Sequence, residues 1–111
     1  MTTTAKSDAP VTLINVFTVS HHLQQRLVDM LVEVKDQVMK RLPGFVSANI
    51  HKSPDGVRVV NYAQWRSTED FEAMMADPAT QAHMTSIEAL AGYDAHLYVI
   101  ADSGSSPSPQ A

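Results

Sequence analysis

The chain of 111 residues carries a formal net charge of −4, from 8 lysines and arginines against 12 aspartates and glutamates. This length predicts one domain whose core needs no disulfides. The absence of cysteine excludes a disulfide framework, a thiolate nucleophile and cysteine-ligated zinc. The sequence has no basic cluster and no apolar run near the roughly 20 residues of a membrane span, so neither nucleic acid nor a membrane is an expected partner. We expect a soluble, cytoplasmic protein.

The two ends of the chain have little apolar content. Residues 1–9 carry no periodic pattern, and residues 103–111 form a short tail rich in serine and proline. Such segments bury too little apolar surface to fold, so we expect both to be disordered. The folded domain is expected to span residues 10–102.

The first half of the domain predicts a strand followed by a helix. Residues 11–19 are rich in β-branched and apolar side chains, and Asn15 shares a face with Leu13 and Phe17. From Ser20, a plausible N-cap, apolar residues recur at steps of three or four up to Leu42. Pro43 and Gly44 then end the pattern. We expect one amphipathic helix of about six turns here.

The middle of the domain predicts a β-hairpin. Residues 45–51 and 57–65 both have strand character, and the segment 53–56, Ser-Pro-Asp-Gly, joins them. Proline fixes φ, and Asp-Gly accepts the positive φ that a tight turn needs.

The last part predicts a broken helix and a final strand. Residues 67–70 resemble a capped helix start, and Asp77-Pro78 restarts a helix that runs to about Leu90, with Gly92 as its stop. Its expected inward stripe contains Ala79, His83, Ile87 and Leu90 or Ala91. Residues 94–101 alternate as a last strand.

The element order β-α-β-β-α-β is typical of a ferredoxin-like α+β sandwich with an antiparallel sheet. Helices on one face leave the other face of the sheet open, and the side chains expected there are largely apolar. We therefore expect a homodimer that forms through this open sheet face.

The strand at 57–65 holds the first candidate site residues. Alternation places Val59, Asn61 and Trp65 on one face and Tyr62 on the other. An asparagine amid valines and a tryptophan needs a partner, because an unpaired buried amide costs about 1–3 kcal/mol. That partner is either a ligand or the protein itself. In the second interpretation Asn61 bonds to backbone and Trp65 is simply core.

Among the five histidines, His83 is the candidate base, since its expected stripe faces the sheet and histidine titrates near neutrality. The alternative is a partly buried, hydrogen-bonded histidine. His21 and His22 lie about 100° apart around a helix and cannot chelate one metal together, and His51 and His96 have no metal-ligand spacing. The sequence predicts no metal site, and it carries no nucleotide, phosphate or esterase motif.

The expected site is an apolar pocket between the helices and the sheet. Aromatic residues and methionines would line it, with the amides of Asn15 and Asn61 and with His83 and Tyr62 as further polar groups. Such a pocket suits a flat aromatic or polyphenolic ligand.

Four segments together resemble the antibiotic biosynthesis monooxygenase family: residues 43–48, Asp55-Gly56, residues 59–65 and Asp77-Pro78. The resemblance covers about residues 11–102. It implies a ferredoxin-like subunit that dimerises into an α/β barrel. In the polyketide-tailoring branch it implies oxidation of anthrone-type phenols to quinones by O₂ without metal, haem or flavin, with the positions of Asn61 and Trp65 in the substrate site.

The sequence departs from that branch at two positions. Phe71 stands where the branch has a tyrosine, and Met84 stands where it has an arginine. In the haem-degrading branch Asn15 and Trp65 have counterparts, but Met75 lies at about the position of the histidine ligand, so haem is disfavoured.

The resulting hypothesis is a cofactor-free monooxygenase that oxidises an anthrone, a hydroquinone or another polyphenol to a quinone. The expected catalytic residues are Asn61, Trp65 and His83, and the expected substrate-binding residues are Asn15, Tyr62, Phe71, Met75 and Met84. Two alternatives stay open. One is a haem-degrading or other enzyme on the same scaffold, and the other is a non-catalytic dimeric protein that binds a small molecule.

Overall fold

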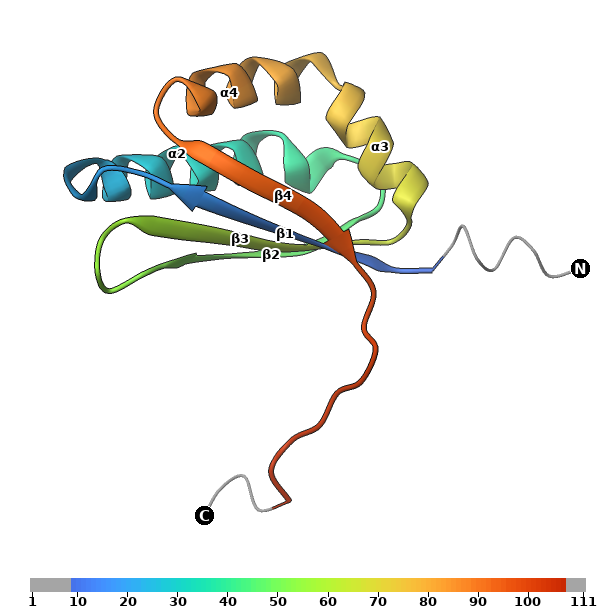
Figure 1. Ribbon diagram of the computed structural model, residues 1–111. Helices are drawn as coiled ribbons and strands as arrows, with labels where there is room; N and C mark the ends of the chain where they lie inside the picture. The colour runs from blue at the N-terminus through green and yellow to red at the C-terminus, as the bar shows by residue number, and fades with distance from the viewer. Residues whose placement is uncertain (1–8, 108–111) are drawn as a thin grey trace, which may run out of the picture.

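The computed structural model describes residues 9–107, so the predicted tails at 1–8 and 108–111 lie outside the described residues. The elements are β1 (Val11–Thr18), η1 (His21–Leu23), α2 (Gln24–Gln37), η2 (Met39–Arg41), β2 (Phe45–Lys52), β3 (Arg58–Trp65), α3 (Thr68–Ala76), α4 (Pro78–Glu88) and β4 (Gly92–Tyr98). The helices lie on one face of the sheet (Figure 1). The ferredoxin-like α+β order is confirmed.

The sheet places the first and third strands at its centre. Its order is β2-β3-β1-β4, and every neighbouring pair is antiparallel. The register sets Asn15 on β1 directly opposite Asn61 on β3, and Ala95 of β4 lies on the other side of Asn15. Residues that are distant in sequence therefore meet at the centre of the helix-covered face.

The prediction of a single long helix between Ser20 and Leu42 is wrong, because the segment divides into η1, α2 and η2. The Ser20 side chain makes no cap hydrogen bond, and Val38, with φ −120° and ψ −60°, leaves the α conformation before η2 begins. The α-helical part begins at Gln24, which is buried and donates from Nε2 to the carbonyls of Ser53 and Arg58. These two bonds fix the start of α2 to the base of the β2–β3 hairpin.

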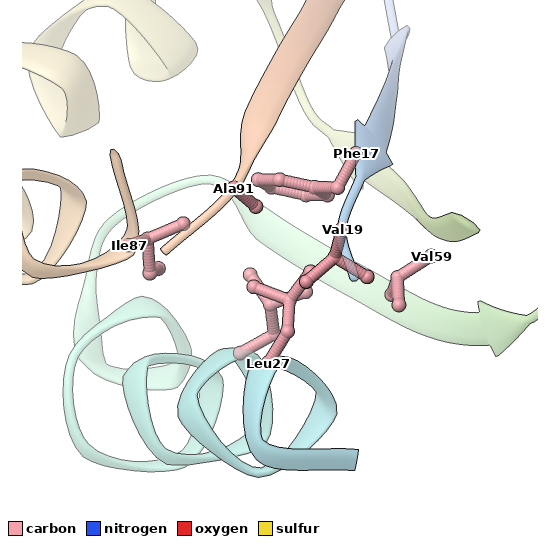
Figure 2. Packing of buried hydrophobic residues seen from close by; sticks show 7 residues of the cluster. Phe17, Val19, Leu27, Val59, Ile87 and Ala91 are labelled. Carbon is pink, nitrogen blue, oxygen red and sulfur yellow. The ribbon is translucent and has the colours of Figure 1, made fainter. Parts of the chain in front are cut away.

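The hydrophobic core forms two clusters under the helices. Figure 2 shows the larger one, in which side chains from the sheet, from α2 and α4, and from the segments that follow β1 and α4 converge: Phe17, Val19, Leu27, Val59, Ile87 and Ala91. The smaller cluster joins Val11, Trp65 and Met74. Burial of Val59, Ala63 and Trp65 confirms the alternation predicted for β3.

The last strand is shifted from its prediction. It spans Gly92–Tyr98, so Gly92 begins a strand rather than only ending a helix. Val99 and Ile100, predicted as strand residues, follow it and are 69% and 67% exposed. All seven residues of β4, which pairs with β1 and forms one edge of the sheet, are exposed.

The open face of the sheet is apolar at its centre and polar towards its edges. Alternation from the paired residues places Ile14 and Val16 of β1 beside Val60 and Tyr62 of β3 on this face. Towards the edges it carries the polar side chains Asn49, His51, Asp94 and His96. Within residues 9–107, no helix has the length and apolar character needed to cross a bilayer.

Candidate functional site

A cavity of about 90 Å³ lies between the sheet and the helices. It is lined by side chains from all four strands, α2, η2, α3 and α4: Leu13, Asn15, Phe17, Leu31, Val34, Lys35, Met39, Phe45, Ala48, Ile50, Asn61, Ala63, Trp65, Phe71, Met74, Met75, Thr80, Met84, Tyr93 and Ala95. Most of this lining is apolar. A flat apolar molecule can therefore bind here by burying its rings against apolar side chains, which removes both surfaces from water.

Four buried polar atoms in the cavity walls lack a hydrogen-bond partner within the described part of the chain. They are Asn15 Oδ1, Asn61 Oδ1, Trp65 Nε1 and Thr80 Oγ1. Buried polar side-chain atoms are usually paired, and each unpaired one costs about 1–3 kcal/mol. Their concentration in the lining of one cavity indicates a binding site, because a ligand there can supply the missing partners.

The sequence-predicted amides are brought together by strand pairing. Asn15 and Asn61 are opposite residues of β1 and β3, and both line the cavity. Asn15 is only 5% exposed. An amide can accept through its oxygen and donate through its nitrogen, so this pair can hold a ligand oxygen in either protonation state.

Trp65 forms one end of the cavity with two phenylalanines. Its ring is 1% exposed, and the rings of Phe45 and Phe71 meet it edge to face, with centroid distances of 5.5 and 6.4 Å. Edge-to-face pairs hold an aromatic ring in one orientation. The indole is thus fixed in the wall while its N–H stays available.

The break between α3 and α4 positions the helix-side wall. Ser67 caps α3 by accepting from the Asp70 backbone N–H, and Asp77 caps α4 by accepting from those of Ala79 and Thr80. Pro78 occupies the first turn of α4, where a missing N–H is tolerated. Ser67 thus begins α3, and Asp77 both ends α3 and begins α4. Phe71 and Met75 of α3 and Met84 of α4 line the cavity, as the sequence predicted.

The predicted inward stripe of α4 is wrong in its first half. The buried positions are Thr80 and Ile87, whereas Ala79 is exposed. His83 is half-buried, its Nδ1 lies 2.9 Å from the Ala79 carbonyl oxygen, and it is absent from the cavity lining. The structure therefore does not bring His83 to the amides. Thr80, which sequence reasoning missed, takes the inward position instead.

Tyr62 also lies away from the cavity. It neighbours Asn61 on β3, and successive side chains of a strand point to opposite faces. Asn61 lines the cavity and Tyr62 does not. The expectation that Tyr62 lines the pocket is wrong, since it belongs to the open face.

Two lining residues, Lys35 and Tyr93, carry titratable side chains. The Lys35 ammonium pairs with Asp36 at 3.1 Å, and the Tyr93 hydroxyl donates to the Glu88 carboxylate at 2.8 Å. This hydrogen bond to Glu88, together with burial, raises the pKa of Tyr93 above its ordinary value of 10.0. Across residues 9–107, no group of three or more histidine, aspartate or glutamate side chains is placed to hold a metal ion.

The sequence matches one family model and one curated relative with high coverage. The model described as antibiotic biosynthesis monooxygenase matches residues 10–86. The chain is 52% identical over 83 residues to the tetracenomycin-F1 monooxygenase of Streptomyces glaucescens, a match that covers 75% of this chain and 74% of that protein.

Solved structures with the same fold include two proteins from Streptomyces. One is the monooxygenase from the gene ActVA-Orf6 of Streptomyces coelicolor in complex with nanaomycin D, with a TM-score of 0.79 and 27% identity over 89% of this chain and 94% of that one. The other is a variant of SnoaB, a cofactor-independent oxygenase from Streptomyces nogalater, with a TM-score of 0.78 and 24% identity over 85% and 95% of the two chains. The second similarity is evidence of fold alone.

Proposed function

The chain belongs to the antibiotic biosynthesis monooxygenase family and is a monooxygenase, and from that premise we propose that it oxidises a phenolic anthrone or hydroquinone to a quinone with O₂. The observation that carries the proposal is the set of four unpartnered polar atoms in the walls of one apolar cavity. An apolar ring system with oxygen substituents fits both properties of these walls. We further propose that the reaction needs no metal, haem or flavin.

The choice of substrate class has support from the relatives. One relative is named for its action on tetracenomycin F1, and one similar structure holds nanaomycin D. Both names belong to those proteins. For this chain they favour a small organic substrate of related chemistry.

The proposed chemistry is driven by the substrate. The anthrone carbon loses a proton to a water molecule to give an electron-rich enolate, which passes one electron to O₂. The two radicals combine into a peroxide at that carbon, and the peroxide eliminates water to leave the quinone carbonyl. For an anthrone, one oxygen atom of O₂ ends in the quinone and the other in water, so no external reductant is consumed. A hydroquinone supplies two electrons rather than four, so its oxidation to a quinone would leave hydrogen peroxide as the reduced product.

In this proposal the two amides stabilise the enolate. The unpartnered Oδ1 atoms of Asn61 and Asn15 accept from phenol hydroxyls of the substrate, and the side-chain nitrogen of Asn61 donates to the developing enolate oxygen. A preorganised donor in a water-poor cavity is worth more than the same donor in water, because it needs no reorganisation during the reaction. Both side chains are already in place on the rigid centre of the sheet.

Trp65, Phe71 and Met84 bind the rings and exclude water. Their side chains line the cavity, and the indole is clamped by its aromatic neighbours. Excluding water protects the enolate and the peroxide from side reactions.

The role of His83 as base has no geometric support, since its ring lies outside the cavity lining. We expect His83→Ala to leave turnover unchanged from about pH 5 to about pH 9. A loss of the alkaline plateau in this variant would restore His83 as the base.

The proposal includes a homodimer formed through the open sheet face, supported by the apolar centre of that face around Val60 and Tyr62. Light scattering after size exclusion tests it. We expect the mass of a dimer for the wild type and the mass of a monomer for Val60→Lys. Val32→Lys, the same change at an exposed position of α2, is the matched control and should stay dimeric.

The decisive experiment is aerobic oxidation of a model anthrone by purified, metal-stripped protein, followed by quinone absorbance. We expect turnover by the wild type, a fall of about 10²–10³-fold in Asn61→Ala, and no change in Gln37→Ala, which removes an exposed amide at the end of α2. Rates equal to buffer for several phenols would contradict the proposed oxidation. Activity that returns only with added metal would contradict its cofactor independence.

A further inference from the structure

We propose that the hydroxyl of Thr80 binds the substrate from the helix side of the cavity, opposite the two sheet amides, and sets its orientation. The identity of the ligand as an oxygenated aromatic rests on the proposed function. The placement of Thr80 rests on the structure alone. Thr80 is thereby a positioning residue that none of the sequence motifs indicated.

Thr80 is the most deeply buried polar residue at the cavity among those described. It is 1% exposed, it lines the cavity, and its Oγ1 has no hydrogen-bond partner among residues 9–107. Its backbone N–H is used, since it donates to Asp77 Oδ2 at 3.2 Å. The side-chain hydroxyl is thus the part of Thr80 that is left for a ligand.

Other hydroxyls on α4 behave differently. Threonine and serine in helices commonly donate to the carbonyl four residues earlier. Thr85 does so to Gln81 at 3.0 Å, and Ser86 approaches Ala82 at 3.5 Å. Thr80 stands alone on this helix in combining deep burial with an unbonded hydroxyl.

The helix break explains this difference. Thr80 lies in the first turn of α4, and the residue four positions earlier, Ala76, belongs to α3. Between them Asp77 is extended, with φ −69° and ψ 130°, so the carbonyl that would normally accept from Thr80 is not in helical position. The cap that restarts the helix therefore also leaves the hydroxyl without a local acceptor.

Thr80 also lies where the cavity meets a second hollow between α4 and β4. Four residues line both spaces: Met75, Thr80, Met84 and Tyr93. Among these four, Met75 and Met84 have no strong hydrogen-bonding group, and the Tyr93 hydroxyl is held by Glu88. Thr80 is therefore the free polar group of this wall.

A ligand that satisfies both walls carries oxygen atoms on two opposite edges of its ring system. The amides contact one edge, and Thr80 contacts the other from α4. A hydroxyl can donate to a carbonyl or accept from a phenol, so Thr80 suits the substrate before oxidation and the quinone after it. A ring system with oxygen on one edge alone would leave one wall unpaired.

The test compares Thr80→Val, which replaces the hydroxyl with a methyl group, with Thr80→Ser, which keeps it. The matched control is Thr85→Val on the same helix, where the lost hydroxyl is exposed and bonded to backbone. The probes are 1,5-dihydroxyanthrone, which carries oxygen on both edges, and its quinone, and the readouts are Kd by calorimetry, KM and kcat, and the Tm of the ligand-free protein.

We expect Thr80→Val to weaken binding of both probes about tenfold, as one lost hydrogen bond implies, while its ligand-free Tm equals or exceeds that of the wild type. Thr80→Ser should bind within about twofold of the wild type, and Thr85→Val should leave Kd unchanged. A structural hydroxyl would instead lower the ligand-free Tm on removal.

Each outcome decides the inference. Unchanged affinity in Thr80→Val, or a fall in its ligand-free Tm with no separate loss of affinity, would overturn the role of Thr80 whatever the turnover. Binding by the wild type without oxidation would overturn the proposed reaction and leave Thr80 to be judged by the affinities. A wild type that binds neither probe would overturn both.

Discussion

The rings of Trp65 and Phe45 meet edge to face, with centroids 5.5 Å apart and an interplanar angle of 82°. Trp65 is the single tryptophan of the chain and lines the cavity. A ligand in the cavity therefore changes the environment of the one strong fluorophore. No mutation is needed to follow binding.

We expect a bound aromatic ligand to quench the Trp65 emission in a saturable way, because its rings come to lie against the indole. Fluorescence titration measures this, and Trp65→Phe should abolish the signal. Calorimetry that detects binding while the emission stays constant would place the ligand elsewhere.

Asn61→Leu separates the effect of the unpartnered amide on stability from its role in oxidation. Because Asn61 Oδ1 is buried without a partner in the described chain, a side chain of similar size without polar atoms removes a desolvation penalty. We expect the free energy of unfolding of the ligand-free protein to stay equal or rise by up to about 1–2 kcal/mol, while oxidation is lost. Urea denaturation measures the first effect. A clear loss of stability would mean that the amide is structural.

Gly44→Ala should be among the most damaging changes outside the cavity. Gly44 has φ of 85°, and an added Cβ would overlap the Asp70 side chain, which itself pairs with Arg66 at 2.9 Å. We expect a loss of at least about 2 kcal/mol from strain and displacement together. Urea denaturation measures it.

The control for this effect is Gly104→Ala, since nothing lies within 4 Å of a Cβ there. It should change stability by less than about 0.5 kcal/mol. If the overlap is responsible, Asp70→Gly, which removes every Asp70 atom that the added Cβ would meet, should recover part of the loss in the Gly44→Ala background of a double-mutant cycle. Simple additivity would argue against the overlap.

Asp55 links stability to acid pH. The Ser53 hydroxyl donates to its carboxylate at 2.6 Å and the Val57 N–H at 3.2 Å, and these bonds hold the pKa of Asp55 below its ordinary value of 3.8. A lowered folded-state pKa stabilises the fold above the unfolded pKa, and this contribution disappears as the pH falls through the folded pKa.

We therefore expect the urea midpoint of the wild type to fall more steeply than that of Asp55→Asn between about pH 5 and about pH 2. Ser53→Ala, which removes the main cause of the shift, should reduce the dependence in the same direction. Identical pH profiles for the wild type and both variants would contradict the assignment.

The strand pattern was readable from sequence because its signal is local. Alternation in residues 57–65 predicted that Val59, Ala63 and Trp65 are buried, and it also separates Tyr62 from Asn61. The opposition of Asn15 and Asn61 was not readable in this way. Register between β1 and β3 depends on pairing across the intervening helix and hairpin, which no local pattern encodes.

The α4 stripe shows the limit more sharply. Asp77 and Pro78 correctly predicted where the helix begins, but a cap does not fix the rotation of a helix about its axis. That rotation is set by packing on the sheet. In the structure it buries Thr80 and Ile87 and leaves Ala79 exposed and His83 half-buried. The spacing 80, 84, 87 and 91 is itself a regular helical stripe and was the available signal for Thr80.

The free hydroxyl of Thr80 was beyond sequence reasoning for a second reason. Nothing in the residue type separates Thr80 from Thr85, whose hydroxyl bonds to Gln81. The difference arises from the extended Asp77, a conformational fact. For the same reason the end of α2 at Gln37 was missed, since Val38 has an apolar side chain that suits the helical pattern and differs only in its backbone angles.

The pairing of Asn15 with Asn61 has a consequence for regiochemistry. Opposite residues of two antiparallel strands are related by a local two-fold axis, so the two amides are equivalent in backbone position. A flat ligand turned end for end would meet the same pair. The indole of Trp65 and the hydroxyl of Thr80 have no symmetry-related counterpart at the cavity. These two groups therefore decide which carbon of the substrate reacts with O₂.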